Sequence, residues 1–252
     1  MTEPLILHRP PPAWQVRSLS PFAVKLEAYL RLAGLPYVAK GADPRRSPTG
    51  KVPYVRLPDG TLMTDSQAIV AHLEAGLGPR ALDAGLTAAE AARAHLVRRT
   101  LEEATYWHVV ALRWHDDGGW PHTRAAFARI LPAVVGPLAL PLVRRQVRGS
   151  LWAQGTTRHP AERRAEHAAA DFAAVAAAAD PVGPFFFGAA PRTVDAVVYA
   201  FVNAVLGFPG PSAVKDAVRG MGRLVALEAA VRARAFPDDP APGGGGPAAL
   251  AG

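Results

Sequence analysis

The chain has 252 residues, half of them hydrophobic, with 28 Lys and Arg against 21 Asp and Glu and a formal net charge of +7. This length accommodates two modest domains around a sizeable core. No run reaches the roughly 20 apolar residues of a membrane-spanning helix, and no basic stretch precedes an apolar segment at the N-terminus, so we predict neither a transmembrane segment nor a secretion signal. The absence of cysteine excludes disulfides and thiolate metal sites, and a cytoplasmic protein fits best.

The positive charge favours anionic ligands in general. Only Arg144, Arg145 and Arg148 form a tight group, and no aromatic residues alternate with them as stacking platforms for bases. We therefore predict no nucleic-acid binding.

The first part of the chain reads as β-α-β followed by β-β-α. Apolar periodicity and turn residues predict a strand over 4–8, a helix over 20–34, strands over 35–39, 54–57 and 61–63, and a helix over 64–74. Pro58-Asp59-Gly60 is a hairpin signal between two of these strands. A parallel β-α-β unit extended by an antiparallel hairpin is the thioredoxin-like plan.

The rest of the chain reads as all-helical after a linker over residues 76–86. Thr87 and Glu90 have capping-box spacing at the start of a helix that runs to about residue 115. Further helices are predicted from Trp120 and over 160–179, 193–206 and 223–235, whereas prolines break the apolar stretch 130–143. The Pro/Gly/Ala tail has nothing to bury. We therefore predict a thioredoxin-like domain over 1–78, an all-α domain over 86–236 and a disordered tail over 237–252.

Three local features of the first domain combine capping with possible chemistry. Ser20 precedes Pro21 and is a natural N-cap, but its hydroxyl at a helix N-terminus would also stabilise a ligand thiolate. Val52-Pro53 opens a strand, and a cis bond there would free the Val52 backbone to pair with a peptide-like ligand. Asp65-Ser66 caps the next helix or, with the local N–H groups, holds an α-carboxylate and an α-ammonium. Lys51 is placed to pair with a second carboxylate.

The order of these features resembles the N-terminal domain of the glutathione S-transferase superfamily. The motifs S-P-F-A-V-K-L-E-A-Y-L-R-L-A-G-L-P-Y, G-K-V-P-Y and D-S-Q-A-I are most similar to its failed-axon-connections and metaxin-like branch, and P-F-F-F-G-A-A-P-R-T-V-D-A-V-V-Y-A-F resembles the approach to the buried helix of the second domain. The likeness covers about residues 4–236. It implies a thioredoxin-like domain followed by an all-α domain.

The resemblance also implies roles for individual residues, with glutathione as co-substrate. Ser20 becomes the thiol activator, with Ser18 as a second hydroxyl and Phe22 beside them. Val52 would bind the cysteinyl backbone next to a cis Pro53. The γ-glutamyl end of glutathione would lie against Asp65 and Ser66, with Lys51 near the glycine carboxylate.

One departure from the family pattern concerns the buried helix of the second domain. Asp195 is in place, but Arg192 occupies the position where relatives carry Ser or Thr. We therefore expect Thr193 to cap instead, with weaker local helix stability and no effect on chemistry.

An acceptor site, if present, is expected between the domains. Tyr106, Trp107 and Trp114 lie on one helix, although aromatic residues at helical spacing are as readily core as pocket. His108 and His115 lack the spacing of a zinc helix, and no metal is predicted.

The leading hypothesis is a glutathione transferase that attacks a small hydrophobic electrophile. The alternative is a non-catalytic, metaxin-like interaction protein, with the stretch 130–143 and the arginines after it touching a membrane or partner. The superfamily resemblance also implies a possible homodimer.

Overall fold

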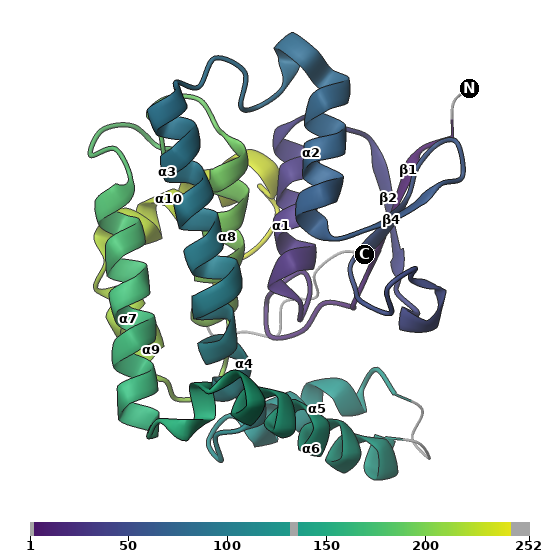
Figure 1. The fold of residues 1–252 in the computed structure, drawn as a ribbon, viewed down its shortest axis with the longest axis vertical. Helices are drawn as coiled ribbons and strands as arrows, with labels where there is room; N and C mark the ends of the chain where they lie inside the picture. The colour runs from purple at the N-terminus through teal and green to yellow at the C-terminus, as the bar shows by residue number, and fades with distance from the viewer. Residues whose placement is uncertain (1–2, 132–135, 243–252) are drawn as a thin grey trace.

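A small mixed sheet forms the first part of the computed structural model, which describes residues 3–131 and 136–242 (Figure 1). Its strands are β1 (Leu5–Arg9), β2 (Tyr37–Gly41), β3 (Tyr54–Arg56) and β4 (Leu62–Thr64). They lie in the order β2-β1-β3-β4, with β1 and β2 parallel and the other pairs antiparallel. The predicted β-α-β and β-β-α units are therefore confirmed, with β2 beginning two residues later than expected.

Two helices connect this sheet to the rest of the molecule. The helix α1 (Pro21–Leu32) is the crossover between β1 and β2, and α2 (Ser66–Leu77) follows β4. They contact each other and lie between the sheet and the helical region (Figure 1). Leu26, Tyr29 and Leu30 of α1 are fully buried in a core that continues into the second half of the chain. Because α1 packs on both sides, ten of its twelve residues are buried.

The helical region follows a linker that contains one short 3₁₀ turn. Its helices are α3 (Ala88–Arg99), the π-helical segment η3 (Thr100–Thr105), α4 (Tyr106–Trp114), α5 (Trp120–Ala128), α6 (Gly136–Gln154), α7 (Ala161–Ala178), α8 (Thr193–Leu206), α9 (Ala213–Arg219) and α10 (Gly222–Ala235). The Thr87 hydroxyl accepts from the Glu90 N–H, and the Glu90 carboxylate accepts from the Thr87 N–H, as the capping box predicts. The long helix expected up to about residue 115 runs through α3, η3 and α4.

The helix α8 is the centre of this region. Every residue from Val194 to Leu206 is buried, and α1 and α10 both pack against it. Tyr199 stacks on Phe236 at a ring-centroid distance of 5.5 Å, which fixes the end of α10 to α8. The prediction that the most hydrophobic helix forms the core of the second half is confirmed.

The N-terminus of α8 is capped differently from the prediction. Thr193 does not cap: its hydroxyl donates to Asp83 Oδ2 at 2.6 Å and its N–H donates to Asp83 Oδ1 at 2.9 Å. Asp195 accepts from the N–H groups of Arg192 at 2.8 Å and Phe186 at 2.6 Å. The linker carboxylate of Asp83 thus accepts from the first N–H of the helix, so the expectation that Thr193 caps α8 is wrong.

The helix α6 is a second correction. The proline-rich stretch 130–143 was expected to be irregular, yet α6 begins at Gly136 and contains Pro141. Leu140 and Leu151 on its inner face are buried, so burial of one apolar face offsets the cost of an internal proline. The part of the stretch over 132–135 lies outside the described residues. The short helix α9 was also not predicted.

Two further expectations concern membrane-spanning helices and the C-terminal tail. Among the described residues, no helix combines the length and the apolar character needed to cross a membrane. The predicted tail begins at Pro237, and within it Asp239 forms an ion pair with Arg17 at 2.7 Å. Residues 243–252 of that tail lie outside the described residues.

Candidate functional site

The strand register brings the three predicted features together at one edge of the sheet, the end where β1 and β4 finish and β3 begins. His8 at the end of β1 pairs with Tyr54 at the start of β3, and Tyr54 pairs with Thr64 at the end of β4. The helix α1 returns across the sheet between two parallel strands, so it begins at the same edge, and α2 begins there directly after β4. Ser20, Val52-Pro53 and Asp65-Ser66 therefore share one end of the domain.

Ser20 occupies the N-cap position of α1 but does not use its hydroxyl as a cap. Its backbone is extended, Pro21 is the first helical residue, and the Ser20 carbonyl accepts from the N–H groups of Ala23 and Val24. Among the described residues the Ser20 hydroxyl has no capping hydrogen bond. The half-buried hydroxyl thus stands at a positive helix terminus with its hydrogen-bonding capacity unused.

Ser18 is placed differently. It is buried, its hydroxyl donates to the Pro10 carbonyl at 3.0 Å, and the same oxygen accepts from the Ser20 N–H at 3.3 Å. These bonds fix the loop between β1 and α1. The structure therefore gives Ser18 a local structural task and leaves Ser20 as the available hydroxyl.

The peptide bond between Val52 and Pro53 is cis, as the family resemblance implies. Pro53 is buried, whereas Val52 is half-buried and lies just outside β3. No loop or turn hydrogen bond within the described part of the chain uses the Val52 N–H or carbonyl. Its backbone is thus positioned to pair with an extended ligand.

Asp65 and Ser66 begin α2, with Asp65 in an unusual backbone conformation. Its φ is +68°, and its Oδ1 accepts from the N–H groups of Gln67 at 2.8 Å and Ala68 at 3.0 Å. Those two amides are therefore occupied, so an incoming carboxylate would meet Ser66 itself. The Ser66 hydroxyl has no hydrogen-bond partner among the described residues, and Lys51, which precedes Val52, is exposed.

Of the predicted acceptor residues, the structure brings Tyr106 to the first domain. Its ring lies 4.9 Å from that of Phe22, and Trp107 packs on Tyr106 at 5.5 Å. Phe22 also meets Phe201 of α8, at 6.0 Å, so it fills the space between the two halves of the chain. Trp114 lies apart from this group.

Trp114 belongs to an aromatic cluster between α4 and α5. Its ring is 5.8 Å from Trp120 and 5.0 Å from Phe127. These contacts hold α5 against α4, and all three rings are half-buried.

Comparison with known proteins identifies the family of this chain. A family model described as the glutathione S-transferase N-terminal domain matches residues 21–119. The isoprene-epoxide–glutathione S-transferase of Rhodococcus sp. (strain AD45) is 32% identical over 206 residues, which are 79% of this chain and 85% of that protein. The chain belongs to the glutathione S-transferase family.

More distant similarities extend to a longer protein and to solved structures of the same fold. The Drosophila melanogaster protein Failed axon connections is 29% identical over 196 residues, 74% of this chain and 46% of that longer protein. A glutathione transferase homologue from Sulfitobacter with bound glutathione has a TM-score of 0.58 at 17% identity, covering 93% of this chain and 95% of its own. The beta-etherase LigF from Sphingobium sp. strain SYK-6 has a TM-score of 0.61 at 17% identity, covering 92% and 96%.

A buried ion pair between α1 and η3 was not predicted from the sequence. Lys25 Nζ of α1 lies 2.5 Å from Glu102 Oε1 of η3, and both side chains are almost fully buried. Glu102 also pairs with Arg98 at 3.1 Å. Burial lowers the pKa of Lys25, and Glu102 opposes that change. The available signal was a lysine on the otherwise apolar face formed by Phe22, Leu26 and Tyr29.

A second missed residue, Arg113 of α4, holds the loop that carries Ser20. Its buried guanidinium donates to the carbonyls of Leu19 at 2.8 Å and Ala204 at 2.7 Å, and lies 5.1 Å from the ring centroid of Trp14. Burial lowers the pKa of Arg113 to about 10, so it remains charged at neutral pH. The residue before Ser20 is thereby tied to α8.

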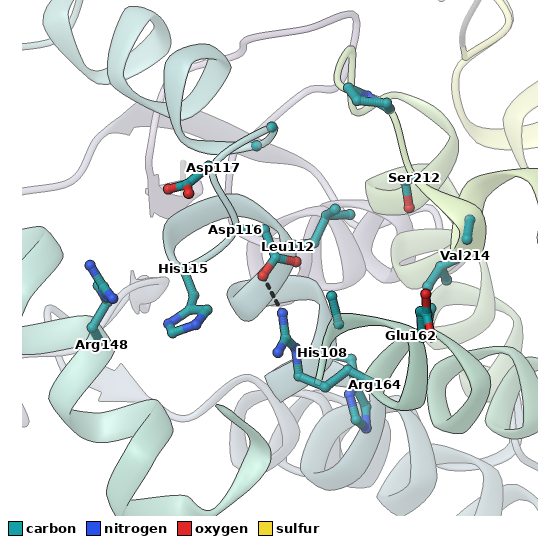
Figure 2. Close-up of a pocket in the computed structure, with 16 residues that line it drawn as sticks. His108, Leu112, His115, Asp116, Asp117, Arg148, Glu162, Arg164, Ser212 and Val214 are labelled. Carbon is teal, nitrogen blue, oxygen red and sulfur yellow. Dashed lines mark hydrogen bonds and ion pairs between the residues drawn. The ribbon is translucent and has the colours of Figure 1, made fainter. Parts of the chain in front are cut away.

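A separate cavity of about 650 Å³ lies within the helical region (Figure 2). Arg164 and Asp116 form an ion pair in its wall, and Nδ1 of both His108 and His115 is buried without a partner among the described residues. Burial, His167 and Arg164 lower the pKa of His108 to about 4. The described residues contain no group of three His, Cys, Asp or Glu that would hold a metal ion. This cavity is formed by α4, α6, α7 and α9 and shares no residue with the edge that carries Ser20.

Proposed function

We propose that this chain is a glutathione transferase that binds glutathione along the edge formed by the start of α1, the Val52-Pro53 bend and the start of α2. The Val52 backbone pairs with the cysteinyl unit, Ser66 and Asp65 receive the γ-glutamyl carboxylate and ammonium, and Lys51 pairs with the glycine carboxylate. The observation that carries this proposal is the meeting of all three features at one sheet edge. Glutathione bound in the solved Sulfitobacter homologue supports it.

Ser20 stabilises the glutathione thiolate in this proposal. A free thiol has a pKa near ~8.5, and a helix N-terminus with one hydroxyl donor lowers it by roughly one to two units. The unused hydroxyl of Ser20 at the N-cap of α1 supports this role. Each unit corresponds to about 1.4 kcal/mol of preferential thiolate stabilisation, which activates the nucleophile without a general base.

The acceptor is a small hydrophobic electrophile bound beside Phe22, Tyr106 and Trp107. The name of the Rhodococcus relative makes an epoxide the first class to test. The thiolate sulfur attacks an epoxide carbon, a C–S bond forms, and the C–O bond breaks. The released electron pair stays on oxygen, which takes a proton from water, so no oxidant or reductant is consumed.

Calorimetry and a conjugation assay on wild type and Ser20→Ala test this function. Wild type should bind glutathione and conjugate a small epoxide. Ser20→Ala should bind with similar affinity but react roughly tenfold more slowly near neutral pH, because it loses the hydroxyl and keeps the helix N-terminus. The matched control is Ser150→Ala, an exposed serine on α6. Equal conjugation rates for wild type and Ser20→Ala would show that Ser20 only begins the helix and does not stabilise the thiolate. Unmeasurable glutathione binding would favour the non-catalytic alternative.

The homodimer implied by the resemblance to the superfamily is part of the same proposal. Light scattering on the purified chain distinguishes a dimer from a monomer.

A further inference from the structure

Almost all of the net positive charge of the chain lies in one segment. Between Asp117 and Glu162 the sequence has six arginines and no acidic residue, so this segment carries six of the seven net positive charges. We call residues 118–161 the α5–α6 segment. Figure 1 shows α5 and α6 along the lower border of the molecule.

Four of these arginines surround a groove of about 460 Å³ between α5 and α6. The groove is lined by Trp120, Arg124, Pro141, Arg144, Arg145 and Arg148. Arg144 is already engaged, because it donates to the Trp114 carbonyl at 2.9 Å and lies 4.6 Å from the ring centroid of Trp120. Arg124, Arg145 and Arg148 are exposed and form no ion pair with another described residue. Unpaired guanidinium groups are suited to phosphate oxygens, which they bind through two parallel hydrogen bonds.

The same surface of α6 exposes large apolar side chains. Leu138 is 75% exposed, Leu142 68% and Trp152 59%. At 100° per residue these three fall on one side of the helix, with Arg145 between them, opposite the buried Leu140 and Leu151. At the C-terminal end of α6, the Arg158 guanidinium lies 5.7 Å from the Trp152 ring centroid. A helix with leucines and tryptophan beside arginines is typical of a protein that lies in a membrane interface.

We propose that the exposed face of α6 docks on an anionic phospholipid membrane. Leu138, Leu142 and Trp152 enter the boundary between headgroups and acyl chains, and Arg124, Arg145 and Arg148 pair with lipid phosphates. Attachment is peripheral, since no helix of the described residues is long and apolar enough to span a bilayer.

Charge and side-chain chemistry favour a lipid membrane on this face over a second copy of the chain or a nucleic acid. A second copy seated on the same face would bring two segments of six arginines together, which like-charge repulsion opposes. A nucleic acid would match the arginines but gives exposed leucines at the centre of the face no apolar partner. An acidic protein matches the arginines as well, and the experiment below separates it from lipid.

The proposal uses no residue of the glutathione site and does not depend on the proposed function. Its test is flotation of the full chain with vesicles of phosphatidylcholine alone or of an equal mixture of phosphatidylcholine and phosphatidylglycerol. We expect binding to the anionic vesicles only, weakened by added salt. Equal binding to both vesicles, or to neither, would overturn the proposal.

Variants separate the two components of the surface. Arg124→Ala/Arg145→Ala/Arg148→Ala should bind anionic vesicles on the order of a hundredfold more weakly, at about fivefold per arginine. The control is Arg45→Ala/Arg163→Ala/Arg219→Ala, which removes the same charge from exposed positions on other elements and should bind as wild type does. An equal loss in both triple variants would refute a localised surface.

Leu138→Ser/Leu142→Ser leaves the charge unchanged and should weaken vesicle binding on the order of a hundredfold. Unchanged vesicle binding by this variant would assign the face to an acidic partner and overturn membrane docking. Circular dichroism and glutathione conjugation should match wild type for all three variants, because none of these residues touches the core or the glutathione site.

Discussion

The buried pair of Lys25 and Glu102 gives the sharpest prediction for stability. Glu102 neutralises two cations, Lys25 at 2.5 Å and Arg98 at 3.1 Å, and the Lys25 side chain is only 1% exposed. Glu102→Leu therefore leaves a buried lysine without its counter-ion. Breaking a buried pair in this way costs about 3–5 kcal/mol of the free energy of unfolding.

The two partners are not equivalent, because Glu102 keeps Arg98 when Lys25 is removed. Lys25→Met should cost at most about 1.5–3 kcal/mol, the contribution of one charged hydrogen bond. The double variant Lys25→Met/Glu102→Leu leaves only Arg98, which is partly exposed and can turn to water. It should be more stable than Glu102→Leu alone, since an apolar pair can replace a buried ion pair.

Urea unfolding followed by tryptophan fluorescence measures these differences. Because burial lowers the pKa of Lys25, the loss in Glu102→Leu should shrink as the pH rises and the lysine becomes neutral. Equal losses in the two single variants, or a double variant that loses the sum of both, would show that Lys25 does not depend on Glu102 for its charge balance.

Three further predictions follow from the same structure. Asp65→Asn should keep the α2 cap and the stability of wild type but weaken glutathione affinity about tenfold in calorimetry. Asp65→Ala should weaken that affinity as well and also lose about 1 kcal/mol of the free energy of unfolding. Full glutathione affinity in Asp65→Asn would show that Asp65 does not bind the ammonium group. Arg113→Met should lose about 2–3 kcal/mol in urea unfolding because two buried carbonyls lose their donor, with partial recovery in Arg113→Lys; a neutral result would contradict its role in holding the loop. The folded-state pKa of His108 is about 4 against an ordinary 6.5. This group therefore favours folding above pH 6.5, and the free energy of unfolding falls as the pH drops toward 4. His108→Gln should make that fall less steep, and an unchanged pH dependence of stability would show that His108 does not cause it.

Local signals explain which parts of the fold were predictable. The helix α8 is continuous and apolar, and its predicted limits match the observed ones. Thr87 and Glu90 lie three residues apart, so their capping box depends on no distant residue. The register between β3 and β4 is equally local once the hairpin at Pro58-Asp59-Gly60 is recognised.

The remaining features depend on contacts between distant parts of the chain. The helix α6 forms despite Pro141 because Leu140 and Leu151 are buried against other helices. Asp83 satisfies Thr193 across 110 positions of sequence. Lys25 and Glu102 are 77 positions apart, and only the fold brings them together. At the candidate site, sequence placed Ser20 at the helix start, but only the structure separates its unused hydroxyl from the engaged hydroxyl of Ser18.

The proposed site binds glutathione at this edge, and Ser20 stabilises its thiolate. The most direct measurement is a pH titration of thiolate absorbance for glutathione bound to wild type and to Ser20→Ala. We predict a pKa of the bound thiol roughly one to two units below that of the free thiol in wild type, and a return toward the free value in Ser20→Ala. A bound thiol whose pKa is the same in both proteins, or equal to that of free glutathione, would contradict thiolate stabilisation by Ser20.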